Sequence, residues 1–170
     1  MSDSRKMGKG MLWVFWCLVL AALAMFFSQL EQNRYTPNQN VSALASSEHN
    51  IVELERNAYG HYVSSGQVNG KEVVFLLDTG ATKVAVPESI AATLGLKRGA
   101  KQQIFTANGI ATAYATEIQS LRIGTIELDS VQASITPGMS GEGILLGMSA
   151  LKHLDFSQSG NILTLKQARE

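Results

Sequence analysis

The feature that most constrains the fold is the stretch Phe-Leu-Leu-Asp-Thr-Gly-Ala-Thr at residues 75–82. Three apolar residues suited to a buried strand run directly into a carboxylate, a hydroxyl and a glycine. An ionisable side chain behind such a strand is costly to bury unless a partner compensates for the lost water. The stretch therefore predicts a central strand that ends at a functional aspartate, Asp78.

The rest of this region reads as short strands separated by tight turns. Val73–Leu77 is apolar on both faces, and Asn69-Gly70 before it suits the positive φ angles of a two-residue hairpin turn. Short helices are expected at 87–94 and 148–154. Further strands are expected at 102–107, 110–116, 121–128, 131–135, 144–147 and 162–165. This pattern predicts one small, mostly β, barrel-like domain over residues 51–168.

The N-terminal segment contains an unbroken apolar run from Met11 to Phe27, and residues 28–30 extend it to the roughly 20 residues that span a bilayer. Arg5, Lys6 and Lys9 precede the run, so the excess of positive charge predicts a cytoplasmic N-terminus and an exported C-terminus. We expect a cytoplasmic segment at 1–10 and a transmembrane helix at 11–30.

Two other interpretations of this run remain open. Ala22-Leu23-Ala24 has the small residues of a signal-peptidase site, but it lies inside the apolar run and apolar residues follow it. A helix of a soluble core would show polar positions at helical spacing. After the run, residues 31–50 are rich in Gln, Asn, Ser and Thr and predict a flexible linker.

Composition excludes several kinds of function. The formal net charge is zero and no basic run is interleaved with aromatics, so nucleic-acid binding has no electrostatic support. The single cysteine, Cys17, lies in the apolar run, so the exported domain has no disulfide, cysteine nucleophile or thiolate zinc site. The three histidines lack metal-ligand spacing, and we expect neither a metal nor a cofactor.

Asp78 alone could not hydrolyse an amide by acid–base chemistry. Two adjacent carboxylates cannot both ionise, so they share a proton. One can then deprotonate a water while the other protonates a carbonyl oxygen. The chain carries one Asp-Thr-Gly triplet, so the second aspartate would have to come from another copy, placed against the first by a two-fold axis.

Leu77–Ala81, following an apolar strand, resembles the active-site motif of retropepsin-like aspartic proteases. The second mark of that family, two apolar residues and a glycine late in the chain, is matched by Leu145, Leu146 and Gly147. In the family, this strand crosses behind the catalytic loop in a ψ-shaped arrangement. The resemblance covers residues 58–166 and is closest to the membrane-anchored bacterial branch.

The resemblance implies a single-lobe retropepsin-like barrel with short helices, preceded by one transmembrane helix. It also implies an aspartic endopeptidase that acts as a homodimer on extended peptides, with no cofactor, in a bacterial inner membrane with the protease domain outside the cytoplasm. Terminal strands near Ile51 and at 162–165 would form an intersubunit sheet. The implied site consists of catalytic Asp78, loop supports Thr79, Gly80 and Ala81, flap residues Ala107, Asn108, Gly109 and Ile110, and ψ-loop supports Leu145, Leu146 and Gly147.

Each of these assignments has a simpler alternative. Asp78 could be an ordinary turn residue at a strand end, and Asn108-Gly109 could be a plain surface hairpin. Leu145–Gly147 could be plain core. The whole domain could be a catalytically inactive peptide-binding or scaffold module at the membrane.

Overall fold

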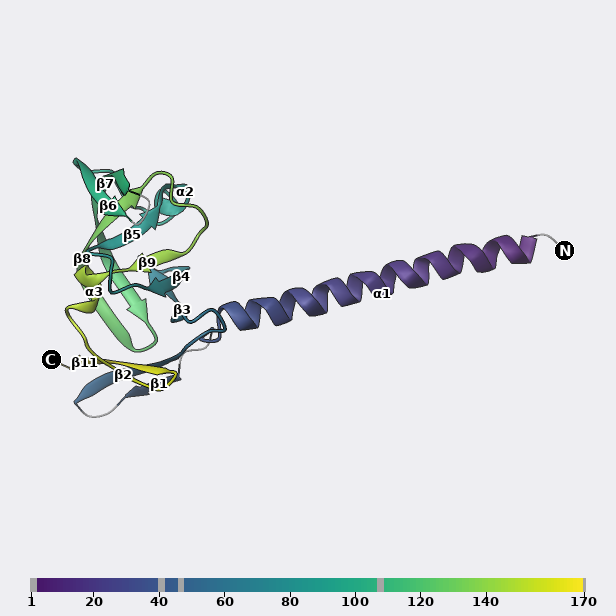
Figure 1. Cartoon of the computed structure of the whole chain (residues 1–170), viewed down its shortest axis with the longest axis horizontal. Helices are drawn as coiled ribbons and strands as arrows, with labels where there is room; N and C mark the ends of the chain where they lie inside the picture. The colour runs from purple at the N-terminus through teal and green to yellow at the C-terminus, as the bar shows by residue number, and fades with distance from the viewer. Residues whose placement is uncertain (1–2, 40–41, 46–47, 107–108, 170) are drawn as a thin grey trace. The chain divides into compact units, whose positions relative to one another are not determined.

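The computed structural model describes residues 3–39, 42–45, 48–106 and 109–169, and it divides into two units, Met1–Tyr35 and Thr36–Glu170. The first unit is a continuous helix, α1 (Asp3–Tyr35) (Figure 1). Its residues Met11–Glu31 have a mean hydropathy of 2.3, and none of this stretch is buried. A helix of this length and composition is compatible with a membrane anchor.

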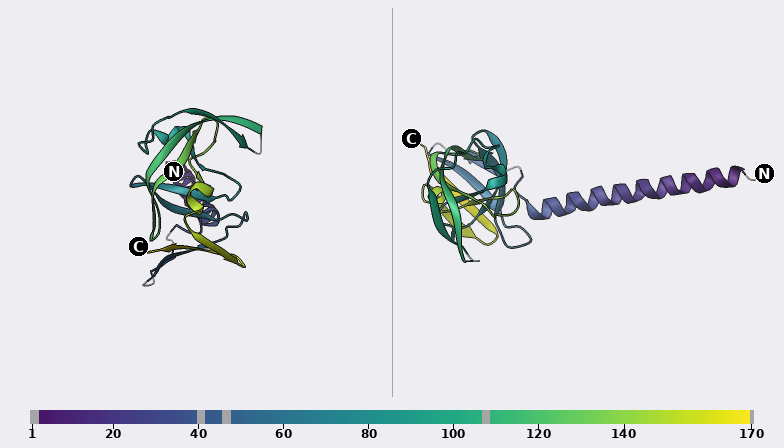
Figure 2. Two further views of the ribbon diagram at one scale, coloured as in Figure 1. Left: turned by 90° about the vertical axis from the view of Figure 1, so that its left-hand side faces the viewer. Right: turned by 90° about the horizontal axis from the view of Figure 1, so that it is seen from above.

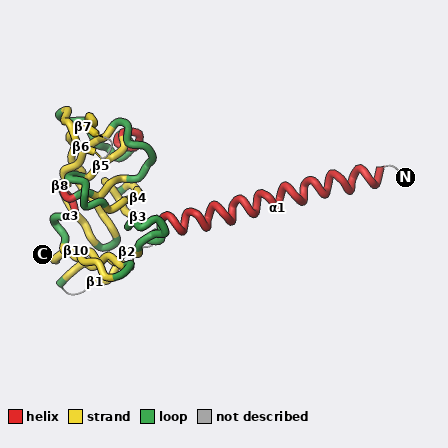
Figure 3. Tube along the Cα trace, in the orientation of Figure 1, coloured by secondary structure: helices red, strands yellow, loops and turns green. Residues whose placement is uncertain are grey.

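The second unit is built mostly from strands, as Figure 3 shows in yellow. Six of them close into a barrel in the order β3-β4-β9-β5-β8-β7, and β7 pairs back with β3. A further strand, β6, extends the sheet beyond β7. The mostly β, barrel-like prediction is therefore confirmed. The seven strands are β3 (Val63–Val68), β4 (Lys71–Leu77), β5 (Val84–Pro87), β6 (Lys101–Thr106), β7 (Gly109–Ile123), β8 (Ile126–Thr136) and β9 (Ile144–Leu146).

The barrel core forms around Phe75 in β4, which is fully buried. Gly66 of β3 lies beside it, where an added Cβ would come within 2.6 Å of the Phe75 ring and 2.4 Å of the Arg122 backbone oxygen. Only a residue without a side chain fits there, so β3 can pack against the aromatic ring and also pair with β7. The β3–β4 turn is the predicted one, with φ angles of 51° at Asn69 and 75° at Gly70.

Both short helices form where expected but are shorter than predicted. Helix α2 spans Glu88–Ala91, and α3 spans Met148–Leu151. After α3, the backbone N–H of Leu154 donates to the Leu151 oxygen, a tighter i to i−3 bond than an α-helix makes. This turn buries Leu154 and directs the chain into the next strand.

The remaining strands form a separate antiparallel sheet in the order β1-β2-β11-β10, drawn in blue and yellow in Figure 2. Its strands are β1 (Ser42–Ala45), β2 (His49–Glu55), β10 (Asp155–Ser159) and β11 (Ile162–Ala168). The two terminal strands predicted to form an intersubunit sheet, β2 and β11, pair with each other inside one chain. Each has a second neighbour in the same chain as well, so neither offers a free edge, and an intersubunit sheet stays a prediction.

The segment 31–50, predicted to be a flexible linker, includes described helix and strand residues. Helix α1 continues to Tyr35, and β1 and the start of β2 occupy part of the segment. Between α1 and β1, the buried side chain of Asn38 forms three hydrogen bonds. Its Nδ2 donates to the backbone oxygens of Glu55 and Val63, and its Oδ1 accepts from the Glu55 N–H at 2.7 Å. Polar composition predicted a linker, and these hydrogen bonds hold Asn38 to the domain.

Candidate active site

Asp78 follows directly after β4 and is held by backbone bonds on both sides. The Leu77 N–H donates to the Tyr62 oxygen at 3.0 Å, and the Asp78 N–H donates to the Leu146 oxygen at 3.2 Å. Its side chain is half-buried. The carboxylate is therefore fixed at the end of a central strand with part of its surface open to solvent.

The loop after Asp78 folds back around the carboxylate. The Gly80 N–H donates to Asp78 Oδ1 at 2.9 Å, and the Ala81 N–H donates to the Asp78 backbone oxygen at 3.2 Å. An added Cβ at Gly80 would lie 3.1 Å from Asp78 Oδ1, so glycine allows this close approach. Thr79 is exposed, and its hydroxyl has no hydrogen-bond partner among the described residues of the chain.

Strand β9 and Gly147 cross behind this loop. β9 lies between β4, in parallel register with Leu76 opposite Leu145, and β5, with Ala85 opposite the same Leu145. At Gly147, an added Cβ would lie only 2.4 Å from the Lys83 oxygen and 2.6 Å from the Ala81 oxygen. The structure therefore brings together Asp78, its loop and the Leu145–Gly147 segment.

Ser149 is a supporting residue that sequence reasoning missed. Its buried hydroxyl accepts from the Val84 N–H at 3.0 Å and donates to the Gln132 oxygen at 2.7 Å. The backbone adds bonds from Met148 N–H to the Ala81 oxygen and from Ser149 N–H to the Thr82 oxygen. Helix α3 is thus bound to the Asp78 loop and to β5 and β8. The available signal was a small polar residue two positions after the glycine of the apolar-apolar-glycine motif.

The β6–β7 hairpin contains the described residues among those predicted to form a flap. Phe105 and Ile110 face each other across the two strands near its tip, and they are 88% and 65% exposed. Gly109 has a φ of 107°, as a tight turn requires. Of the flap candidates, Ala107 and Asn108 lie outside the described residues. One hydrogen bond of 3.3 Å, from Lys83 Nζ to Gln102 Oε1, joins the Asp78 loop to the first strand of the hairpin.

This arrangement supplies one positioned carboxylate and no second one from its own loop. A single carboxylate cannot act as acid and base in the same step, so one chain contains half of an acid–base pair. Among the described residues, no group of three His, Cys, Asp or Glu side chains could hold a metal ion. The Asp78 carboxylate held in this geometry can accept or donate a proton.

Comparison with known proteins connects this geometry to a family. Residues 64–153 match the family model described as gag-polyprotein putative aspartyl protease. An uncharacterized protein from the cobV 5' region of Sinorhizobium sp. is 28% identical over 171 residues, which cover 93% of this chain and 73% of that protein. An uncharacterized protein of Rickettsia prowazekii (strain Madrid E) is 27% identical, and the match covers 81% of this chain and 62% of that protein.

Among solved structures, the fold is similar to the crystal structure of a retropepsin-like aspartic protease from Rickettsia conorii. The TM-score is 0.61 and the sequence identity is 26%. The match covers 75% of this chain and 99% of that one.

Proposed function

This chain belongs to the retropepsin-like aspartic protease family, and from that membership we propose that it is a membrane-anchored aspartic endopeptidase, active as a homodimer. The observation that carries the proposal is the position of Asp78. Its carboxylate is held at the end of β4 by the Gly80 N–H while part of it stays accessible. A structural turn aspartate would not need the close crossing of Gly147 behind its loop.

The reaction would use the two Asp78 carboxylates of the dimer, with one proton shared between them. The ionised carboxylate takes a proton from water as the water oxygen bonds to the peptide carbonyl carbon. The protonated carboxyl donates its proton to the carbonyl oxygen, which gives a tetrahedral diol. Proton transfer to the amide nitrogen then allows the C–N bond to break. No metal or cofactor has a role in this scheme.

The second copy would join at the four-stranded sheet. Strand β10 is a free edge of that sheet, all five of its residues are exposed, and it carries an exposed Phe156. Unprotected edges pair readily with another strand, and β10 contains neither lysine nor proline to prevent it. Anchoring both copies in one membrane would raise their effective concentration and favour this pairing.

The substrate would be a peptide in an extended conformation. The exposed Phe105 and Ile110 of the β6–β7 hairpin are suited to close over its side chains, and strand edges are suited to pair with its backbone. Gly109 and Ile110 would then belong to the flap.

Asp78→Asn tests the chemistry directly. The amide oxygen of the new side chain can still accept from the Gly80 N–H, so the fold should persist while proton transfer is lost. We expect peptide cleavage at acidic pH by the full-length protein in detergent to fall by roughly 10³-fold or more. Asp129→Asn, at an exposed aspartate without a following Thr-Gly, is the matched control. Equal activity of Asp78→Asn and the control would exclude the protease mechanism and leave a peptide-binding or scaffold module.

For location, we propose a single-pass protein of a bacterial inner membrane with its N-terminus in the cytoplasm. The support is the apolar stretch of α1 and the cluster of Arg5, Lys6 and Lys9 before it. An impermeant maleimide applied to intact spheroplasts should label Ser89→Cys in a Cys17→Ser background, because Ser89 is exposed in the domain. The matched Ser4→Cys variant should react only after lysis, and the reverse pattern would contradict this orientation.

A further inference from the structure

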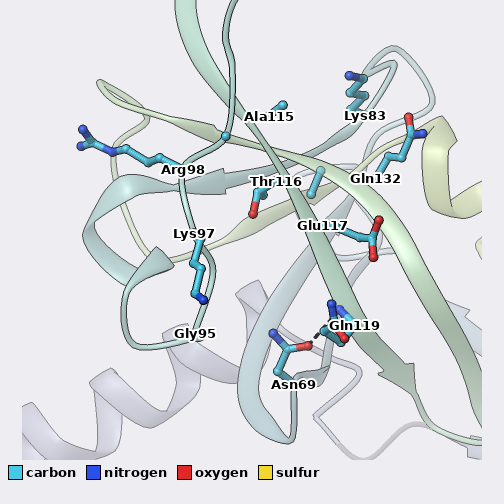
Figure 4. A pocket seen from close by; sticks show the side chains of 12 residues that line it. Asn69, Lys83, Gly95, Lys97, Arg98, Ala115, Thr116, Glu117, Gln119 and Gln132 are labelled. Atoms are coloured by element: carbon cyan, nitrogen blue, oxygen red, sulfur yellow. Dashed lines mark hydrogen bonds between the residues drawn. The ribbon is translucent and has the colours of Figure 1, made fainter.

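Part of one backbone edge of strand β7 is not hydrogen-bonded to a neighbouring strand in the described part of the chain. This edge faces the loop before β6, and we refer to the unpaired part as the opening. A groove of about 760 Å³ lies here, lined by residues of β7, by the loop 95–99 and by part of β8 (Figure 4). Its lining includes none of residues 78–81 and none of the described residues at the tip of the β6–β7 hairpin. The groove therefore does not include Asp78 or the described hairpin tip, and Lys83 of the Asp78 loop lies at its edge.

Both ends of this opening are closed by hydrogen bonds. At one end, the Gly99 N–H donates to the Ala115 oxygen at 2.7 Å and the Ala115 N–H donates to the Ala100 oxygen at 2.9 Å. At the other end, Asn69 Oδ1 accepts from the Gln119 and Ser120 N–H groups, both at 3.1 Å. An opening of four residue steps, about 13 Å of strand, lies between Ala115 and Gln119.

The centre of the opening exposes the backbone of Glu117. Alternate residues of a strand direct their N–H and C=O groups to the same edge, so Glu117 faces the same way as Ala115 and Gln119. No hydrogen bond to either of these Glu117 groups is found among the described residues. The backbone N–H donor and C=O acceptor of Glu117 are therefore available to pair with the backbone of an extended ligand.

The groove is positively charged. Lys97 and Arg98 lie on one side of β7 and Lys83 on the other, as Figure 4 shows. Arg98 already pairs with Glu88 and lies over the Tyr114 ring. Neither lysine forms an ion pair with a described residue, and Glu117 is the single carboxylate in the lining. The charges available in the groove are therefore two lysines, which favour an acidic ligand.

We propose that this groove binds an extended acidic peptide segment of a protein partner. The segment pairs its backbone with Glu117 and places carboxylates near Lys83 and Lys97. If the proposed protease function holds, the groove recruits protein substrates at a distance from the bond to be cut. The binding itself does not require that function.

The test uses full-length protein in detergent carrying Asp78→Asn, so that no probe is cleaved. The probe is a fluorescein-labelled octapeptide of alternating threonine and glutamate, with binding followed by fluorescence anisotropy. We expect it to bind more tightly than the same peptide with glutamine in place of glutamate. Lys83→Gln with Lys97→Gln should weaken binding about fivefold, and Glu117→Gln should strengthen it about twofold. The matched control, Lys152→Gln with Lys166→Gln, changes two exposed lysines outside the groove and should have no effect.

Two further measurements identify how the peptide binds. Saturating peptide should slow hydrogen–deuterium exchange across residues 115–119, and N-methylation at alternate peptide positions should abolish binding, because pairing with Glu117 requires a free backbone edge. Unchanged exchange, or equal weakening by the groove and control lysine variants, would overturn the proposal. Tight binding of the N-methylated peptide, displaced by inorganic tripolyphosphate, would show a simple anion site instead. Because Asp78 is already substituted, none of these outcomes bears on the cleavage chemistry.

Discussion

At the scale of single residues, Gly147 and Ser149 determine how the Asp78 loop is supported. Gly147 lets two backbone segments cross at a distance that no side chain would allow, and Ser149 joins two strands through one buried hydroxyl. Gly147 acts by letting two backbone segments approach closely, and Ser149 acts by hydrogen-bonding backbone groups. Neither residue therefore needs to touch a substrate. The predicted ψ-loop glycine was recognisable from its motif, whereas the supporting role of the serine follows from its contacts.

Gly147→Ala should destabilise the domain, because its Cβ would lie 2.4 Å from the Lys83 oxygen and the backbone there has little room to move. We expect a loss of about 2–3 kcal/mol in the free energy of unfolding, measured by urea denaturation of the full-length protein. Gly143→Ala is the matched control, since an added Cβ there meets nothing within 4 Å. Its expected change is within about 0.5 kcal/mol. Equal stability of the two variants would contradict the crossing geometry.

At the scale of elements, the β6–β7 hairpin and the four-stranded sheet show different relations to the sequence. The hairpin follows from the alternation of apolar and polar residues along its strands and from a turn that contains glycine, so its existence was predictable. Its exposed Phe105 and Ile110 are a tertiary finding, because alternation does not show whether anything covers that face. The β2–β11 pairing joins Leu54 to Leu163, and no local pattern specifies so distant a partner.

Phe105→Ala should lower kcat/KM for peptide cleavage by about tenfold, because a side chain that is 88% exposed in the free protein can be buried only when substrate binds. The unfolding temperature should change little for the same reason. Tyr59→Ala, at another exposed aromatic residue in the β2–β3 connection, should leave kcat/KM unchanged. If both variants had wild-type kinetics, the hairpin would not be a substrate-binding flap.

At the scale of the whole molecule, the main consequence is that one chain holds one positioned aspartate. The sequence has one Asp-Thr-Gly triplet, so one chain cannot supply a second such loop. The sheet of β1, β2, β11 and β10 leaves β10 free to pair with a second copy. Catalysis should therefore depend on association.

Mixing wild-type and Asp78→Asn chains in equal amounts tests this dependence. If each site needs one Asp78 from each chain, random pairing in a two-fold dimer leaves about one quarter of the activity of the same total amount of wild-type protein. Independent chains would leave about one half. The mixture is allowed to exchange in detergent before peptide cleavage is measured, and an Asp129→Asn mixture should retain full activity. A value of one half after complete exchange would exclude the shared site.

The sequence by itself determined the features that depend on neighbouring residues. These are the apolar strand that ends at Asp78, the Asn69-Gly70 turn and the long apolar helix, because local side-chain chemistry and spacing are sufficient to favour each of them. The tertiary structure alone decided the features that depend on distant segments meeting. Asn38 clamps a stretch that reads as a linker, Ser149 reaches Val84 across 65 positions, and Glu117 faces an open groove. Hydrogen-bond partners and open strand edges are set by packing, which no local pattern encodes.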